Sequence, residues 1–178
     1  MAKARRKPEP EAPQTKTPPR AHLRLTLAAC ILASSVVFID GTVLTVALPA
    51  LRKDLAADYA LLQWVMNGYV LALAALTLIG GALSDRYGHA KVLAAGCLLF
   101  ALASAGCALA PDIGWLIAAR VLQGIAAALV APSSLALIGS AFPRSERSAA
   151  IGVWAAASAL AAGIAPGIGG GAPEEMGR

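Results

Sequence analysis

Five long stretches of the sequence carry almost no charged side chains. They run over residues 25–48, 61–83, 92–110, 114–138 and 149–171. Each is close to or longer than the roughly 20 apolar residues that a transmembrane helix needs. Backbone polar groups inside a bilayer are satisfied only in helices and closed barrels, and the alternating ten-residue pattern of barrel strands is absent. We therefore predict an all-α fold, a polytopic membrane helix bundle of about five transmembrane helices.

The composition agrees with a membrane protein and divides the chain into three parts. Hydrophobic residues make up 58% and charged residues 14% of the sequence, whereas soluble domains carry roughly 25% charge. Residues 1–24 are basic and proline-rich, and we expect a disordered arm because they cannot bury a core. Residues 25–171 form the expected bundle, and residues 172–178 are a short polar tail.

Basic residues are more numerous in every second connection between the apolar stretches, starting with the N-terminal arm. The arm holds seven, and the second–third and fourth–fifth connections hold two each, while the first–second connection has two that Asp54 and Asp58 offset. The positive-inside rule then places the N-terminus in the cytoplasm of a multi-pass protein of the cell (inner or plasma) membrane. A basic arm can bind nucleic acid, but beside an apolar segment we interpret it as a topology signal and expect no nucleic-acid partner.

Two ionisable residues, Asp40 and Arg120, lie inside the apolar stretches. Facing lipid, either would cost roughly 2.5–3.5 kcal/mol on insertion scales. At about 1.5 Å per residue, Asp40 lies about 8 Å from the outer face of a 30 Å core, and Arg120 lies about 10 Å from it on a helix entering from outside. We therefore expect them to share one internal cavity and to pair. The alternative is a structural ion pair without a role in transport.

Catalytic and metal-binding chemistry finds little support. Cys30, Cys97 and Cys107 all fall in apolar stretches, where we interpret them as small buried residues. His22 and His89 lie outside the spans, so no nucleophile and base converge within them. We expect no enzyme activity, no metal and no cofactor.

Helix-breaking residues mark the fourth and fifth stretches. Pro132 and Pro166 each permit a kink in a membrane helix. Gly163, Gly167 and Gly171 are spaced by four residues, which lets a neighbouring helix approach closely. Ordinary tight packing explains the same pattern equally well.

Two sequence motifs lie near the ends of the first two apolar stretches. One is at the end of the first stretch, and the other covers the end of the second stretch and the connection that follows it. Residues 39–49, IDGTVLTVALP, resemble the first-helix motif LDxTVxNVALP, with Thr45 where Asn is usual. Residues 81–91 resemble a loop motif GxLaDrxGrk, with His89 and Ala90 in place of its basic pair. The residues that match, or that take the place of a match, are Gly81, Asp85, Arg86, Gly88 and Lys91. Within this motif we expect Gly81 to allow close packing and Gly88 to allow a tight turn.

Two further motifs lie in the fourth and fifth stretches. Residues 116–124, LIAARVLQG, resemble lxxxRxxqG with Arg120, Gln123 and Gly124 in register. The fifth stretch resembles GxxxxxxxxGxxxGPxxGG, with alanines at two of its glycine positions. Its matching residues are Gly152, Pro166, Gly169 and Gly170. These four motifs occur in the expected order and on the expected helices. Together they make the chain resemble major facilitator superfamily transporters, and most of all the drug/proton antiporters of the fourteen-span multidrug efflux branch.

The resemblance implies a role for each motif. Asp40 and Arg120 would belong to the cavity and to proton coupling. Asp85 would bind the N-terminal end of a helix in the other half of the transporter, a contact of a carboxylate with a helix dipole. The glycines and proline of the fifth stretch would let helices rock during alternating access. The partners implied are the lipid bilayer, a small amphipathic drug-like substrate and protons.

The length of the chain bears on this function. The family fold contains two bundles of six helices, and five spans correspond to part of the N-terminal half. We expect a truncated N-terminal fragment of an antiporter-like transporter. The alternatives are a small membrane protein that oligomerises to form a transport pathway, or a membrane remnant that does not transport.

Overall fold

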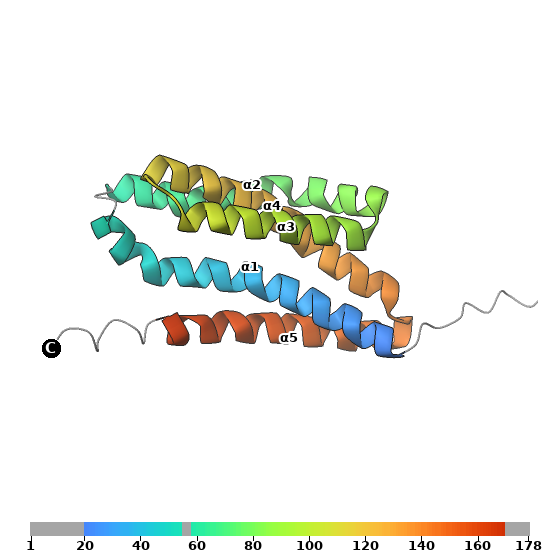
Figure 1. Ribbon diagram of the computed structural model, residues 1–178. Coiled ribbons are helices and arrows are strands. Elements are labelled where there is room, and N and C mark those ends of the chain that lie inside the picture. The colour runs from blue at the N-terminus through green and yellow to red at the C-terminus, as the bar shows by residue number, and fades with distance from the viewer. Residues whose placement is uncertain (1–19, 55–57, 170–178) are drawn as a thin grey trace, which may run out of the picture.

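A computed structural model describes residues 20–54 and 58–169, and every regular element in these ranges is a helix. The helices are α1 (Arg20–Asp54), α2 (Tyr59–Tyr87), α3 (His89–Ala108), α4 (Ile113–Ala141) and α5 (Arg144–Gly169) (Figure 1). Each contains a segment long and apolar enough to cross a membrane. The predicted all-α membrane bundle is confirmed.

The helices extend past the apolar stretches at several ends. α1 begins at Arg20, so the last residues of the arm, which we expected to be disordered, are helical through Arg24. α5 begins at Arg144, before the stretch that starts at residue 149. Long arginine side chains allow this because their stems pack on apolar surface while their charged ends reach water. Residues 1–19 of the arm and the tail 172–178 lie outside the described residues.

Short connections begin and end the helices at residues suited to caps and turns. Asp58 Oδ1 accepts a hydrogen bond from Tyr59 N (2.7 Å), and Asp112 Oδ1 accepts one from Trp115 N (2.8 Å) at the start of α4. Such caps satisfy amides that lack a partner within the helix. Gly88 joins α2 to α3 at φ +97°, a conformation that side chains with a Cβ rarely adopt. The tight turn predicted for Gly88 is thus confirmed.

α4 is the central helix of the bundle. It packs most extensively against α2 and α3, while α1 packs against α5 and also contacts α4. In Figure 1, α1 and α5 lie side by side beneath the group of α2, α3 and α4. Many of the buried residues of α4 are small, and they include Ala119, Gly124, Ala126, Ala127, Ala128, Ser133 and Ser134. Small residues let membrane helices approach closely where no water drives them together.

Close contacts between helices occur at glycines other than those we expected. Gly80 of α2 lies against the backbone of Ala128, and Gly124 lies against the backbone of Tyr69, so a Cβ at either position would clash. The neighbouring Gly81 has only ordinary contact space, with Pro132 Cβ at 3.9 Å. The closest approach to α4 is made at Gly80 because the helix turns this residue, one position earlier, toward α4.

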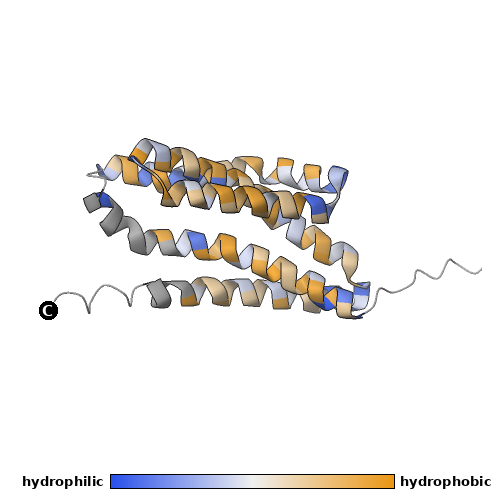
Figure 2. Cartoon of the chain, viewed as in Figure 1, coloured by the Kyte–Doolittle hydropathy of each residue, from blue (hydrophilic) through white to orange (hydrophobic). Residues whose placement is uncertain are grey.

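At Gly163, a Cβ would meet no atom of the described residues within 4 Å, so no described helix approaches closely there. α4 remains helical through Pro132. Figure 2 shows apolar residues along the length of the helices and hydrophilic residues gathered near several helix ends. Large apolar side chains such as Leu32, Leu78 and Leu160 are exposed on the bundle. Such an apolar surface is suited to contact with lipid rather than with water.

Candidate functional site

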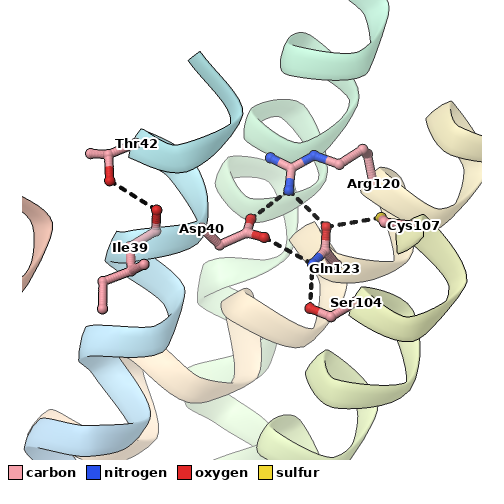
Figure 3. A network of polar contacts seen from close by, with 7 residues as sticks. All are labelled: Ile39, Asp40, Thr42, Ser104, Cys107, Arg120 and Gln123. Carbon is pink, nitrogen blue, oxygen red and sulfur yellow. Dashed lines mark hydrogen bonds and ion pairs between the residues drawn. The ribbon is translucent and has the colours of Figure 1, made fainter. Parts of the chain in front are cut away.

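Asp40 of α1 and Arg120 of α4 meet across the interface between their helices. Arg120 Nη1 donates a hydrogen bond to Asp40 Oδ2 within an ion pair (Figure 3). The Arg120 side chain is 3% exposed and that of Asp40 is 22% exposed. The expected pairing is therefore confirmed, and its less buried member is the carboxylate.

Gln123, one turn after Arg120, joins the pair to α3. Its Oε1 accepts a hydrogen bond from Arg120 Nη1 (2.7 Å), and its Nε2 donates to Asp40 Oδ1 (3.1 Å). The same Nε2 donates to Ser104 Oγ (2.7 Å), and Cys107 Sγ donates to Oε1 (3.2 Å). Gln123 is 1% exposed, so these contacts replace the water that its amide loses on burial.

The motif around Arg120 points to Gln123, whereas none of the four motifs contains Ser104 or Cys107. These two residues are three apart and therefore share one face of α3. This spacing is the sequence feature that could have identified them. We call Asp40, Arg120, Gln123, Ser104 and Cys107 the polar network. Because its side chains come from α1, α3 and α4, the polar network links three helices in the apolar interior.

Tyr69 of α2 brings the fourth helix to the polar network. The guanidinium carbon of Arg120 lies 4.4 Å from the centre of the Tyr69 ring, within the range of a cation–π contact. Arg120 Nε is buried and makes no hydrogen bond within the described part of the chain. The positive charge is thus held by a carboxylate, an amide oxygen and an aromatic face.

A second group of polar contacts joins α1, α4 and α5. Trp154 Nε1 donates to Ser34 Oγ (3.0 Å), and Ser34 Oγ shares a hydrogen bond with Ser134 Oγ (3.1 Å). A cavity of about 210 Å³ lies beside them. Its lining residues are Ser34, Val37, Phe38, Tyr69, Leu73, Val130, Ala131 and Trp154. Because Tyr69 also faces Arg120, this mainly apolar and aromatic cavity adjoins the polar network.

The loop motif lies at the turn from α2 to α3 and shares no residue with the polar network. Ser84 Oγ and His89 Nδ1 share a hydrogen bond of 2.8 Å. The Asp85 side chain is 77% exposed, with Oδ1 3.9 Å from His89 Nδ1. Arg86 lies over the Tyr87 ring, 5.6 Å from its centre. Lys91 is exposed, so the charged side chains of this motif point away from the bundle core.

The polar network includes none of the described residues of the helix-five motif. Gly152 is exposed, and a Cβ built there would meet nothing within 4 Å. Pro166 and Gly169 lie in the last turns of α5. Gly170 lies outside the described residues.

Comparison with known proteins gives a consistent set of relatives. The sequence profile of the Major Facilitator Superfamily matches residues 30–174. The chain is 38% identical over 145 residues to the tetracenomycin C resistance and export protein of Streptomyces glaucescens, covering 82% of this chain and 27% of that protein. It is 43% identical over 147 residues to the methyl viologen resistance protein SmvA of Salmonella typhimurium, covering 82% of this chain and 30% of that protein.

A third relative is the multidrug resistance protein Stp of Mycobacterium tuberculosis. It is 39% identical over 147 residues, which cover 82% of this chain and 27% of Stp. The chain thus spans less than a third of the length of these curated relatives.

Proposed function

Because the chain belongs to the major facilitator superfamily, we propose that it takes part in proton-driven export of small amphipathic molecules, with Asp40 as the proton-binding group. The observation that carries the proposal is the ion pair of Asp40 with the buried Arg120. A guanidinium keeps its charge at all physiological pH values, whereas a carboxylate exists in a charged and a neutral form. Asp40 is therefore the member of the pair whose charge can change.

The hydrogen bonds around Asp40 support such a change of state. In the charged form, Oδ2 accepts from Arg120 and Oδ1 accepts from Gln123 Nε2. A proton on the carboxyl group removes the ionic attraction and turns one acceptor oxygen into a donor. Arg120 would then stay in place through Gln123 Oε1 and the Tyr69 ring. Protonation would thus loosen α1 from α4 while Arg120 keeps its contacts with Gln123 and Tyr69.

The cavity beside Ser34 supports an amphipathic substrate that contains an aromatic ring. Phe38, Tyr69 and Trp154 contribute aromatic surface to it, and aromatic faces attract both flat rings and organic cations. The relatives named above are resistance or export proteins, two of them for tetracenomycin C and methyl viologen. Since Tyr69 contacts both cavity and Arg120, a substrate there would change the surroundings of the ion pair.

The loop motif is proposed to gate the transport pathway. Asp85 is largely exposed and its only ionic contact in the described residues is the 3.9 Å approach to His89. The carboxylate is therefore available to the positive N-terminal end of another helix. Gly81, Arg86, Gly88 and Lys91 would shape and orient this turn, while Gly152, Pro166, Gly169 and Gly170 would let α5 move against its neighbours.

The proposed location is the cell membrane with the N-terminus in the cytoplasm. The support is the excess of basic residues near the start of α1, the α2–α3 turn and the α4–α5 turn. In this orientation the loop motif faces the cytoplasm, and Asp40 lies toward the outer half of the bilayer.

The test is transport by the full chain in proteoliposomes with an acidic interior, using ethidium as the probe. We expect uptake driven by the pH gradient, abolished by Asp40→Asn and retained by Ser140→Ala, which removes an exposed hydroxyl outside the polar network. The assay is repeated over a range of protein-to-lipid ratios, because a rate rising more steeply than protein density indicates a pathway built from several copies. Absence of uptake at every ratio would contradict a pathway built from this chain by itself, and uptake unchanged by Asp40→Asn would contradict the proposed role of Asp40.

A further inference from the structure

A cavity of about 290 Å³ lies where the start of α1 meets the turn from α4 to α5, and the transport proposal does not use it. Its lining residues are Arg20, Leu23, Arg24, Phe142 and Glu146. None of them belongs to the polar network or to the cavity beside Ser34. We call these five residues the basic pocket.

Positive charge in and around the basic pocket exceeds negative charge. Arg20 and Arg24 are exposed and line the pocket, and Glu146 is its only acidic lining residue. No ion pair within 4.0 Å joins Glu146 to an arginine in residues 20–54 and 58–169. Two further arginines, Arg144 and Arg147, lie in the same first turn of α5. The net charge of this region is therefore positive and not cancelled by direct pairing.

Arg147 adds an unused donor close to the pocket. Its Nη2 donates weakly to the carbonyl of Phe142, at 3.5 Å, and its Nε is buried without a hydrogen-bond partner in the described residues. Phe142 is itself a lining residue. A buried donor without an acceptor is unfavourable, and the guanidinium of Arg147 adds positive charge next to a residue that lines the pocket.

The pocket also has an apolar side. Leu23 is 6% exposed and Phe142 is partly buried against the core. Both membrane-crossing segments that meet here, Arg20–Thr42 and Arg144–Ile164, begin at this point. The pocket therefore lies at the level where the apolar bilayer interior meets the headgroups, with guanidinium groups and apolar side chains in one hollow.

We propose that the basic pocket binds the phosphate group of an anionic phospholipid such as phosphatidylglycerol, which thereby joins the start of α1 to the start of α5. Arginine forms strong charge-assisted hydrogen bonds to phosphate oxygens, and basic pockets between transmembrane helices bind acidic headgroups. Free phosphate shares the ionic chemistry, but Leu23 and Phe142 favour a ligand that continues into an acyl chain. The lipid is thus a structural ligand of the α1–α5 pair.

The experiment measures lipid binding to the detergent-solubilised full chain by native mass spectrometry, together with its thermal unfolding. The ligands are phosphatidylglycerol, phosphatidylcholine and inorganic phosphate at equal concentrations. We expect phosphatidylglycerol to bind and to raise the unfolding temperature, with little effect of the other two. Each of Arg20→Gln and Arg24→Gln should weaken phosphatidylglycerol binding about fivefold, the factor that corresponds to about 1 kcal/mol for each arginine near a lipid surface.

Arg86→Gln is the matched control because it removes the same charge at an exposed position on α2, outside the pocket. It should leave binding within about twofold of the original chain. Equal binding of phosphatidylcholine, equal stabilisation by inorganic phosphate, or an equal loss in Arg86→Gln would overturn the proposal. If a glutamine variant does not fold, as judged by helix content, Arg24→Lys keeps the charge and loses the guanidinium fork, and it should weaken binding less than Arg24→Gln.

Discussion

Asp40 on α1 and Arg120 on α4 are 80 residues apart in sequence and form an ion pair that both share with the side-chain amide of Gln123. One end of the pair is almost wholly buried, while the other keeps about a fifth of its side chain exposed. This unequal burial gives the pair a fixed member and a member that can exchange a proton. It also makes the interface between α1 and α4 depend on the charge state of a single carboxylate.

Breaking the ion pair should destabilise the bundle. We expect Arg120→Gln to lower the free energy of unfolding by about 3 kcal/mol, because it leaves the Asp40 carboxylate in the interior without its cation. Asp40→Asn and Arg120→Gln together should cost less than the sum of the single changes. The measurement is a double-mutant cycle by denaturant titration in mixed micelles, and additive effects within about 0.5 kcal/mol would show that the two residues are not coupled.

Exchanging the two charges tests the pairing itself. The Asp40→Arg and Arg120→Asp variants each place like charges together, so each should unfold at lower denaturant than the original chain. The double exchange restores an opposite pair and should recover part of the lost stability. If the double variant is no more stable than either single variant, the direct contact does not hold the helices together.

Gln123 should contribute to the stability of the bundle as well as orient Asp40 and Arg120. Gln123→Leu has a similar volume but removes the donor to Asp40 and Ser104 and the acceptor for Arg120 and Cys107. Unpaired buried polar groups cost about 1–3 kcal/mol, and we expect a loss in that range in the same titration. Ser140→Ala, which removes an exposed hydroxyl on the same helix, is the control and should change stability by less than about 0.5 kcal/mol. An equal effect of the two variants would contradict the role of Gln123.

A methyl group at Gly124 should separate α2 from α4. A Cβ there would clash with the backbone at Tyr69, so Gly124→Ala should lower stability by about 1–3 kcal/mol. Gly139→Ala on the same helix is the control, because a Cβ there meets nothing within 4 Å and alanine favours helix by up to about 1 kcal/mol. The two variants should therefore shift the unfolding midpoint in opposite directions. A stabilised Gly124→Ala variant would show that the helices are not in close contact at this point.

Cysteine labelling tests the proposed orientation in the membrane. In a background where Cys30 and Cys97 are alanine and Cys107 is serine, single cysteines replace Pro111 in the α3–α4 turn or Ser145 at the start of α5, both of which are exposed. A membrane-impermeant maleimide should label the Pro111→Cys variant in intact cells. It should label the Ser145→Cys variant only after the cells are permeabilised. The reverse pattern would place the N-terminus outside.

Several features of the fold and site follow from the sequence alone. The near-absence of charge over five stretches of adequate length determines that helices form there, because a bilayer admits only helices and closed barrels. The pairing of Asp40 with Arg120 followed from their similar depth along oppositely directed helices. A charged residue in an apolar span needs a partner, and the sequence contains only these two within the spans.

Only the tertiary structure decided which helix faces meet. In soluble helices an apolar stripe marks the buried face, but these helices are apolar on nearly all sides, since lipid and protein neighbours favour similar side chains. The sequence therefore determined the number of helices, the turn at Gly88 and the central ion pair. It did not distinguish Gly80 from Gly81, did not bring Ser104, Cys107 and Tyr69 to Arg120, and did not place Arg20 and Arg24 opposite Phe142. Those contacts depend on the rotation and pairing of the helices, which close packing sets and hydrophobicity does not.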